Sequence, residues 1–217
     1  MNLKIDMHVH SCYSKDGFEQ IKDIIAEAKR KGLDGIALTD HNTQEGVAEA
    51  KKEGVNQGIV VISGIEIKTE KGDVLAYGIT KTIKKGMSVE KTICAIHKAE
   101  GLAVAAHPFP EPAHRTKMHK FLDVGFDIIE TANARSLFMN KKAKKMAQKL
   151  NIPQTGGSDA HSLKEIGNAY TEISASGKNE KSILDALRLG NTTAVVSKNT
   201  SIYSFIYCTI KRIAKKC

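Results

Sequence analysis

The feature that most constrains the fold is a regular alternation of strand-like and helix-like segments along the 217 residues. Short apolar runs predict strands at residues 3–9, 35–39, 59–67, 73–79, 103–106, 126–130, 153–157, 169–173 and 194–196. Apolar residues at helical spacing predict helices at 18–31, 44–53, 88–100, 117–122, 137–150 and 180–189. Seven or so strands, each followed by a helix, favour an α/β chain with a parallel sheet, either open or closed into a barrel. Residues 71–73 form a turn between two of these strands.

The composition fits one globular domain, with 41% hydrophobic and 26% charged residues. No stretch reaches the roughly 18 to 20 apolar residues that span a bilayer. The cysteines show neither CxxC spacing nor a disulfide framework, and no signal peptide is present, so we expect a cytoplasmic protein. The net charge of +9 favours anionic partners such as phosphorylated metabolites, nucleic acid or an anionic membrane, or else reflects a lysine-rich solvated surface.

Residues 201–217 depart from the alternation. Apolar residues recur there at helical spacing, and basic residues gather at the end of the segment. The pattern predicts a basic amphipathic C-terminal helix. Such a helix can lie on a membrane surface, but we favour packing on the domain, with the cations at the favourable end of the helix dipole.

Polar residues that can bind metal ions gather where the predicted strands end, which is where (β/α) barrels place their chemistry. Alternation along a strand places His8 and His10 on the same side, within reach of one metal ion. The other candidates at strand ends or in the turns that follow are Asp16, His41, Glu66, His107, Glu130, Asp159 and His161. Five of the eight histidines therefore lie at strand ends, beside Asp, Glu or another His.

The other three histidines lie elsewhere. His97 falls inside a predicted helix, while His114 and His119 fall in a polar segment after Pro112. We interpret all three as structural or solvated residues. His114 is the best further candidate among them, because it follows His107 closely.

Mixed imidazole and carboxylate ligands suit zinc, manganese or iron. The candidates exceed what one tetrahedral ion needs, so two or three divalent ions that share bridging carboxylates are implied. Clustered ions neutralise an anionic substrate, generate hydroxide near neutral pH and stabilise the leaving oxygen, which fits phosphate esters better than amides. This chemistry needs no nucleophilic serine or cysteine, and we interpret Cys12 as a packing residue.

Five motifs, in this order, resemble the polymerase and histidinol phosphatase (PHP) domain: Asp6-x-His8-x-His10, Thr39-Asp40-His41-Asn42, Gly64-Ile65-Glu66, His107-Pro108 and Gly157-Ser158-Asp159-Ala160-His161. Each motif is common alone, and their shared order makes the match specific. The resemblance covers roughly residues 1–200, which we expect to form one metallophosphoesterase domain. It implies a distorted, TIM-like (β/α) barrel of seven strands with a trinuclear metal centre.

Carried over by position, the resemblance distributes the candidates over three ions. The implied ligands are His8, His10 and Asp159 for the first ion, Glu66 as a bridge to the second, His107 and a strand-six residue for the second, and Asp16, His41 and His161 for the third. The strand-six ligand is Glu130 or, alternatively, Asn133. The residues implied to act directly in catalysis are His8, His10, His41, Asp159 and His161.

Four further polar residues lie beside these motifs. We interpret Asp40 as a hydrogen-bond partner that orients a histidine ring, and Asp6 as doing the same or capping the strand end. Arg135 and Arg115 follow strand ends and could hold a substrate phosphate through two hydrogen bonds each. The alternative is that both are ordinary surface arginines.

The leading hypothesis is a metal-dependent phosphoesterase that acts on a small phosphorylated metabolite or nucleotide. About forty residues separate Glu66 from His107, which leaves little room for a lid. The alternatives are a histidinol-phosphate phosphatase, a hydrolase of amides or cyclic esters, and a non-catalytic accessory module of a nucleic-acid enzyme. The retained ligands argue against the last, since buried carboxylates are costly without a metal. Nucleic acid is a less favoured substrate, because 5% aromatic residues leave little surface for base stacking.

Overall fold

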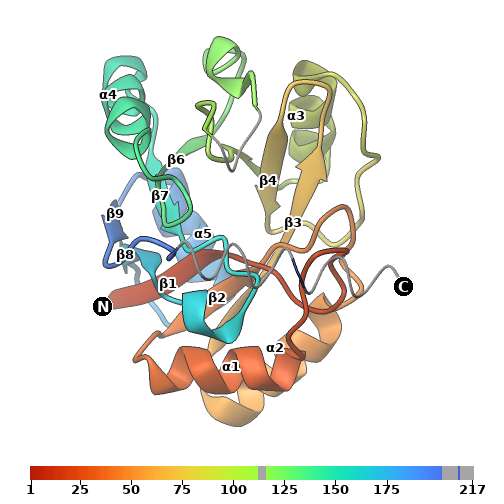
Figure 1. The fold of residues 1–217 in the computed structure, drawn as a ribbon, viewed down its shortest axis with the longest axis vertical. Helices are drawn as coiled ribbons and strands as arrows, with labels where there is room; N and C mark the ends of the chain where they lie inside the picture. Colours follow the sequence, from red (N-terminus) through yellow and green to blue (C-terminus); the bar gives the residue numbers. More distant parts are fainter. Residues whose placement is uncertain (112–115, 202–209, 211–217) are drawn as a thin grey trace.

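The computed structural model describes residues 1–111, 116–201 and Ile210 (Figure 1). Its strands are β1 (Asn2–Val9), β2 (Gly35–Leu38), β3 (Val60–Lys68), β4 (Asp73–Tyr77), β5 (Leu102–Ala105), β6 (Ile128–Asn133), β7 (Gln154–Gly157), β8 (Ala169–Ser174) and β9 (Thr192–Val196). Its helices are α1 (Ile21–Arg30), α2 (Val47–Gln57), α3 (Val89–Lys98), α4 (Asn140–Leu150) and α5 (Glu180–Arg188), with short 3-10 turns η1 (Met118–Lys120) and η2 (Leu163–Glu165).

Within these residues one nine-stranded sheet has the order β7-β6-β5-β4-β3-β2-β1-β8-β9. The pairs β1–β2, β2–β3, β5–β6 and β6–β7 are parallel. By contrast, β4 and β8 are antiparallel to both of their neighbours. The carboxyl ends of β1, β2, β3, β5, β6 and β7 therefore meet at one edge of the sheet, and the amino end of β4 lies at the same edge.

The sheet curls into a nearly closed barrel because the segment after β7 returns to β1. Val9 pairs with Ala160 in a parallel bridge, and the His10 N–H donates to the Ala160 carbonyl at 3.0 Å. Gly157 permits this close approach, since a Cβ atom there would lie 2.4 Å from the Cβ of His8. The fold is the distorted TIM-like barrel that the sequence predicted.

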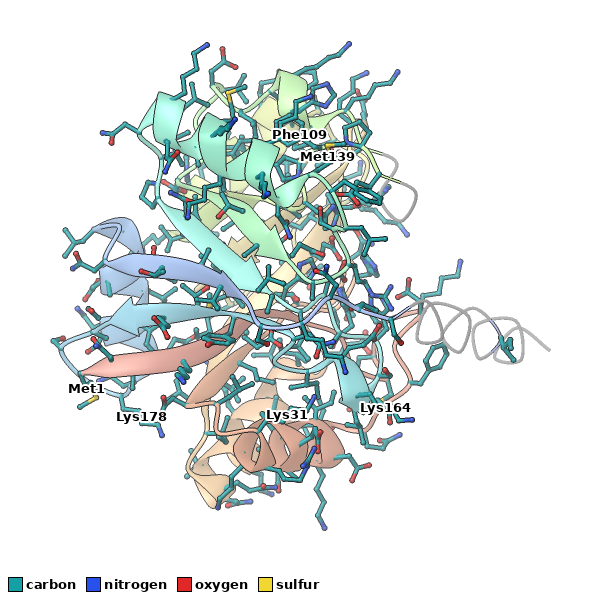
Figure 2. All side chains as sticks on the ribbon, turned by 60° about the vertical axis from the view of Figure 1, so that its left-hand side comes forward. Met1, Lys31, Phe109, Met139, Lys164 and Lys178 are labelled. Atoms are coloured by element: carbon teal, nitrogen blue, oxygen red, sulfur yellow. The ribbon has the colours of Figure 1, made fainter. Side chains whose placement is uncertain are left out.

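Three apolar clusters hold this barrel together. The inner cluster combines strand residues such as Ile5, Leu75 and Tyr77 with Ile183 and Leu187 of α5. A second cluster packs α1 and α2 against β2, and a third packs α3 and α4 against β3 to β6. In Figure 1, α1 and α2 lie below the strands, and α3 and α4 lie above them. Figure 2 shows Phe109 and Met139 on the side covered by α3 and α4, where they pack in the third cluster.

The sheet differs from the prediction in the direction of two strands. Each of the predicted strand ranges overlaps an observed strand, but the sheet is mixed rather than parallel, because β4 and β8 run antiparallel to their neighbours. A parallel connection needs a crossover of about a dozen residues or more, usually a helix. Residues 69–72 between β3 and β4 are too few for that, so β4 runs back beside β3. Residues 158–168 lead from β7 to β8, which pairs with β1 rather than with β7.

Two predicted helices are also shorter in the structure. Residues 117–122 form only η1, and α4 begins at Asn140 rather than at residue 137. The cause of the second difference is the buried carboxylate of Glu111, which accepts the N–H groups of Leu137 and Met139 at 2.7 Å each. An anion at a helix N-terminus satisfies N–H groups that have no partner within the helix. These bonds fix a turn in front of α4.

Of the predicted C-terminal helix at 201–217, only Ser201 and Ile210 lie within the described residues. That helix and the domain boundary near residue 200 stay predictions. In the part of the chain that the structure describes, no helix is both long and apolar enough to cross a membrane.

Glu180, the first residue of α5, ties that helix to two other elements. Its Oε1 accepts the N–H of Ser63 in β3 at 2.7 Å, and its Oε2 accepts a hydrogen bond from Nζ of Lys51 in α2 at 2.6 Å. Burial alone would raise the pKa of Glu180, but these bonds hold the pKa below its ordinary value. The ionised carboxylate therefore stabilises the folded state.

We predict that Glu180→Gln lowers the free energy of unfolding by about 1 kcal/mol near neutral pH. A carboxyl group with a lowered pKa stabilises the fold above its unfolded-state pKa, about 4.3, and loses that effect as the pH falls through its folded-state pKa. The difference between variant and wild type should therefore shrink in acid. Urea unfolding followed by circular dichroism, at neutral pH and at about pH 3, measures this. Glu172→Gln, on an exposed position of β8, is the control, and an equal loss at both pH values would contradict the prediction.

Candidate metal centre

The predicted ligands converge at the edge of the barrel where the parallel strands end. They come from β1 and the turn after it, from the ends of β2, β3, β5 and β6, and from the segment after β7. In chain order they are His8, His10, Asp16, His41, Glu66, His107, Glu130, Asp159 and His161. Asp16 and His41 are half-buried, and the other seven are buried. The structure thus brings together all nine predicted metal ligands, from six strands and the segments that follow them.

β1 is irregular where it carries His8 and leads into His10. The pairing of β1 with β2 shifts register between Asp6 and Val9. Met7 packs in the inner apolar cluster, whereas Val9, two residues further on, packs in the cluster of α1 and α2. Bulges redirect side chains in this way and are frequent next to functional sites.

Left-handed backbone recurs in three of the segments that carry ligands. Asn42, His107 and Asp159 have φ angles of 58°, 25° and 54°. Such a conformation costs a non-glycine residue roughly 1–2 kcal/mol, and it persists where the surroundings hold it. Here Oε2 of Glu130 accepts the His107 N–H at 2.8 Å, and Oδ1 of Asn42 accepts the Lys68 N–H at 2.9 Å.

Glu66 is the central residue of the site. Its Oε2 lies 3.0 Å from Nδ1 of His41 and 3.4 Å from Nε2 of both His8 and His10. Its Oε1 lies 3.1 Å from Nε2 of His107. Burial alone would raise the pKa of Glu66, but the charges of His41 and His8 hold it well below its ordinary value. Contacts with His41, His8 and His107 thus favour the ionised form of a fully buried carboxylate.

Two aspartates, Asp159 and Asp16, also lie close to the histidines of the site. Oδ1 of Asp159 lies 3.3 Å from Nε2 of His10 and 3.6 Å from Nδ1 of His161. Asp16 lies at the outer side of the site, 3.6 Å from Nε2 of both His41 and His161. Burial alone would raise the pKa of Asp16, but the nearby His161 and His41 hold it well below its ordinary value.

Both residues considered for strand six face the site. Oε1 of Glu130 lies 2.9 Å from Nδ1 of His8, and its carboxylate belongs to a group with His8 and His107 that could hold an ion. Asn133 donates from Nδ2 to Glu130 at 3.1 Å and to Asp159 at 3.5 Å. Glu130 thus belongs to a candidate ligand group, and Asn133 donates hydrogen bonds to two of the carboxylates.

The donor atoms fit a group of divalent ions. Within 4.8 Å of one another lie the ligand atoms of three overlapping groups: His8, His10 and Glu66; His8, His107 and Glu130; and His10, His41 and His161. Nε2 of His8 and Nε2 of His10 are buried without a hydrogen bond, although most buried polar atoms have one. Ions between these side chains would satisfy both nitrogens, and mixed nitrogen and oxygen donors suit zinc, manganese or iron.

Asp6 and Asp40 bind backbone and serine hydroxyl groups rather than histidine rings. Asp6 accepts the N–H groups of Ser158 and Gly167 at 2.8 Å each, and burial raises its pKa to about 6. Asp40 accepts both the N–H and the hydroxyl of Ser11 at 2.6 Å. The expectation that Asp40 orients a histidine ring is therefore corrected. Both carboxylates fix the turns that carry ligands.

Of the two arginines considered for phosphate binding, only Arg135 lies within the described residues, whereas Arg115 lies outside them. Nη2 of Arg135 lies 3.0 Å from Oε1 of the buried Glu165. Oε2 of Glu165 in turn accepts the N–H of His161 at 2.8 Å. Arg135 is thus held by Glu165, which also binds the backbone of His161, and it is not an ordinary exposed surface arginine.

Of the histidines set aside in the sequence, the described His97 and His119 belong to none of the candidate ligand groups. His97 is exposed on α3, 2.8 Å from Asp127. His119 stacks on Phe109, with ring centroids 5.5 Å apart. His114 lies outside the described residues.

The sequence reasoning missed Asp73, which is the first residue of β4. Its carboxylate lies with Glu66 and His107 in a fourth group whose ligand atoms are within 4.8 Å of one another. Ligands were sought at the carboxyl ends of strands, but β4 is antiparallel and brings its amino end to the site. A hairpin turn directly after a ligand-bearing strand was the signal that could have identified Asp73.

Known proteins share both the motifs and the fold. A family model described as the PHP domain matches residues 6–120, and one described as PHP-associated matches residues 139–192. An uncharacterized protein of Methanocaldococcus jannaschii is 34% identical over 164 residues, covering 68% of this chain and 95% of that protein. A phosphoribosyl 1,2-cyclic phosphate 1,2-diphosphodiesterase of Eggerthella lenta is 36% identical over 62 residues, 29% of this chain and 23% of that enzyme.

Among solved structures, a two-domain protein of Bacteroides vulgatus that contains a predicted PHP-like metal-dependent phosphoesterase superimposes with a TM-score of 0.76. The identity is 22%, and the match covers 90% of this chain and 65% of that one. This likeness supports the barrel fold. The family model spans more than half of the chain, and together with the archaeal relative it shows that the chain belongs to the PHP domain family.

Proposed function

We propose that this protein is a metal-dependent phosphoesterase that hydrolyses a small phosphorylated metabolite or nucleotide. The observation that carries the proposal is the buried Glu66 carboxylate, with nitrogen atoms of four histidines within 3.4 Å at the edge of the barrel. Membership of the PHP family and the activity named for the Eggerthella lenta relative support it. The net charge of +9 favours the approach of an anionic substrate.

The proposed ligands divide into three sets around Glu66. His8, His10 and Asp159 would bind a first ion, and His107 and Glu130 would bind a second. Glu66 would contribute to both of these sites. Asp16, His41 and His161 would bind a third ion. The distances among the ligand atoms support two or three ions in close proximity. Zinc, manganese and iron all accept such mixed ligands.

The substrate would enter from the side of the third set. Side chains of Asp16 and His41 are 27% and 26% exposed, whereas those of His8 and Glu66 are at most 1% exposed. When bound, the ions would neutralise the phosphate charge and lower the pKa of a water molecule at the site.

Arg135 is the proposed phosphate contact of this site. Its guanidinium is held by Glu165, which also binds the backbone of His161. Because the guanidinium is charged and planar, a phosphate at the third set could bind it through charge-assisted hydrogen bonds. The side chain is only 12% exposed, so its position is fixed before the substrate arrives.

We predict that the protein, loaded separately with manganese, zinc and iron, releases phosphate from small phosphate esters. The panel should include nucleotides, cyclic nucleotides and histidinol phosphate, with lactams as the test of amide chemistry. His8→Ala should lower the turnover rate by more than about a hundredfold, since even partners that merely orient metal ligands contribute ten- to a hundredfold. His97→Ala, an exposed histidine on α3, is the matched control. Wild-type protein that binds these ions and hydrolyses none of the esters would refute the proposal.

A second prediction concerns Arg135. Arg135→Met should raise KM for the best phosphate ester about tenfold or more, because a hydrogen bond to a charged group contributes about 1.5–3 kcal/mol. Steady-state kinetics measures this, with thermal unfolding alongside, since the variant leaves Glu165 without its arginine. Arg188→Met, on an exposed position of α5, is the matched control. An unchanged KM in a folded Arg135 variant would remove Arg135 from the substrate site.

A further inference from the structure

Asp73 lies on the same face of the sheet as Glu66. In the antiparallel pairing of β3 with β4, Lys68 is opposite Asp73, and Glu66 is opposite Leu75. Side chains of directly paired residues share a face, as do residues two apart along a strand. Asp73 is therefore the diagonal neighbour of Glu66, at the edge where the ligands gather.

The carboxylate of Asp73 lies between two proposed ligands and an exposed lysine. Ligand atoms of Asp73, Glu66 and His107 lie within 4.8 Å of one another. Oδ1 of Asp73 is buried and forms no hydrogen bond. Nζ of Lys68 lies 3.2 Å from each carboxylate oxygen, but the Lys68 side chain is 57% exposed and reaches in from solvent.

This arrangement places the carboxylate of Asp73 beside that of Glu66. The two side chains are 14% and 1% exposed, so water screens their mutual repulsion poorly. The exposed Lys68 is screened by water and offsets this repulsion weakly. A divalent ion between Asp73, Glu66 and His107 would convert the repulsion into attraction, because both carboxylates could then bind it.

We propose that Asp73 is an additional ligand of the metal centre, completing with Glu66 and His107 a site for one divalent ion. The inference rests on the proposed function, from which it takes Glu66 and His107 as ligands of the second ion. Together with Glu66 and Glu130, Asp73 would make that ion's environment rich in carboxylate oxygen. Carboxylate-rich sites favour hard ions such as manganese over softer ones. Lys68 keeps a positioning role, holding the carboxylate in place.

Metal affinity tests the proposal. Manganese binding to the full chain, measured by equilibrium dialysis with elemental analysis, should show one ion bound at least about tenfold more weakly in Asp73→Asn than in wild type. Asp34→Asn is the matched control, because Asp34 holds Lys178 at the same distance of 3.2 Å but lies away from the site. Lys68→Met should leave the number of bound ions unchanged. Unchanged manganese affinity in Asp73→Asn would overturn the proposal.

A spectroscopic variant separates direct ligation from an indirect effect. Cobalt(II) added to Asp73→Cys should give a thiolate-to-cobalt charge-transfer band in the near ultraviolet. That band should be absent from wild type and from Asp34→Cys. A folded Asp73→Cys protein that binds cobalt without the band would show that position 73 does not ligate, which overturns the proposal. None of these readouts depends on turnover, so an inactive protein that binds ions as described would refute the proposed function and leave the role of Asp73 standing.

Discussion

The structure depends on one constraint, which is that a fully buried carboxylate must be compensated. Glu66 is 1% exposed and lies in β3, at the centre of the edge where six strands bring their polar residues. An isolated buried charge would be strongly unfavourable. Four histidines from β1, β2 and β5 surround it, and Asp159 and Asp16 balance those histidines in turn. Closing the barrel is what brings β7 and its aspartate beside β1.

Further carboxylates hold the backbone that carries these ligands. Asp6 joins β1 to the segment after β7, Asp40 joins the end of β2 to the turn after β1, and Glu130 holds the left-handed His107. Glu165 and Glu111 act in the same way at the outer turns. Apart from Glu130, which is itself a proposed ligand, these carboxylates bind backbone N–H groups and need not touch the metal ions. Asp6 and Asp40 show why two of the motifs contain an acidic residue in addition to their ligands.

The sequence predicted the barrel and the converging residues because strand ends and ligand types are local features. The turn at residues 71–73 was a local signal that β4 runs back along β3, but ligands were sought only at carboxyl ends, and Asp73 was missed for that reason. The antiparallel direction of β8 could not be predicted, because β8 pairs with β1, which is distant in sequence. Nor could simple alternation along β1 show the register shift after which Val9 packs with α1 and α2 while Met7 packs inside the barrel. The start of α4 was misplaced because Glu111, distant in sequence, binds the turn in front of it.

The ligands become more exposed from the centre of the site to its rim, and this affects how tightly the proposed ions would be held. His8, His10 and Glu66 are at most 1% exposed, whereas His41 and Asp16 are each about a quarter exposed. Coulombic attraction between an ion and its ligands is stronger where water is excluded, and it is screened at the rim. The inner ions would therefore be held more tightly than the outer one. The outer ion would also be the one that the proposed phosphate substrate could reach, so tight binding at the centre and access at the rim would follow from the same gradient of burial.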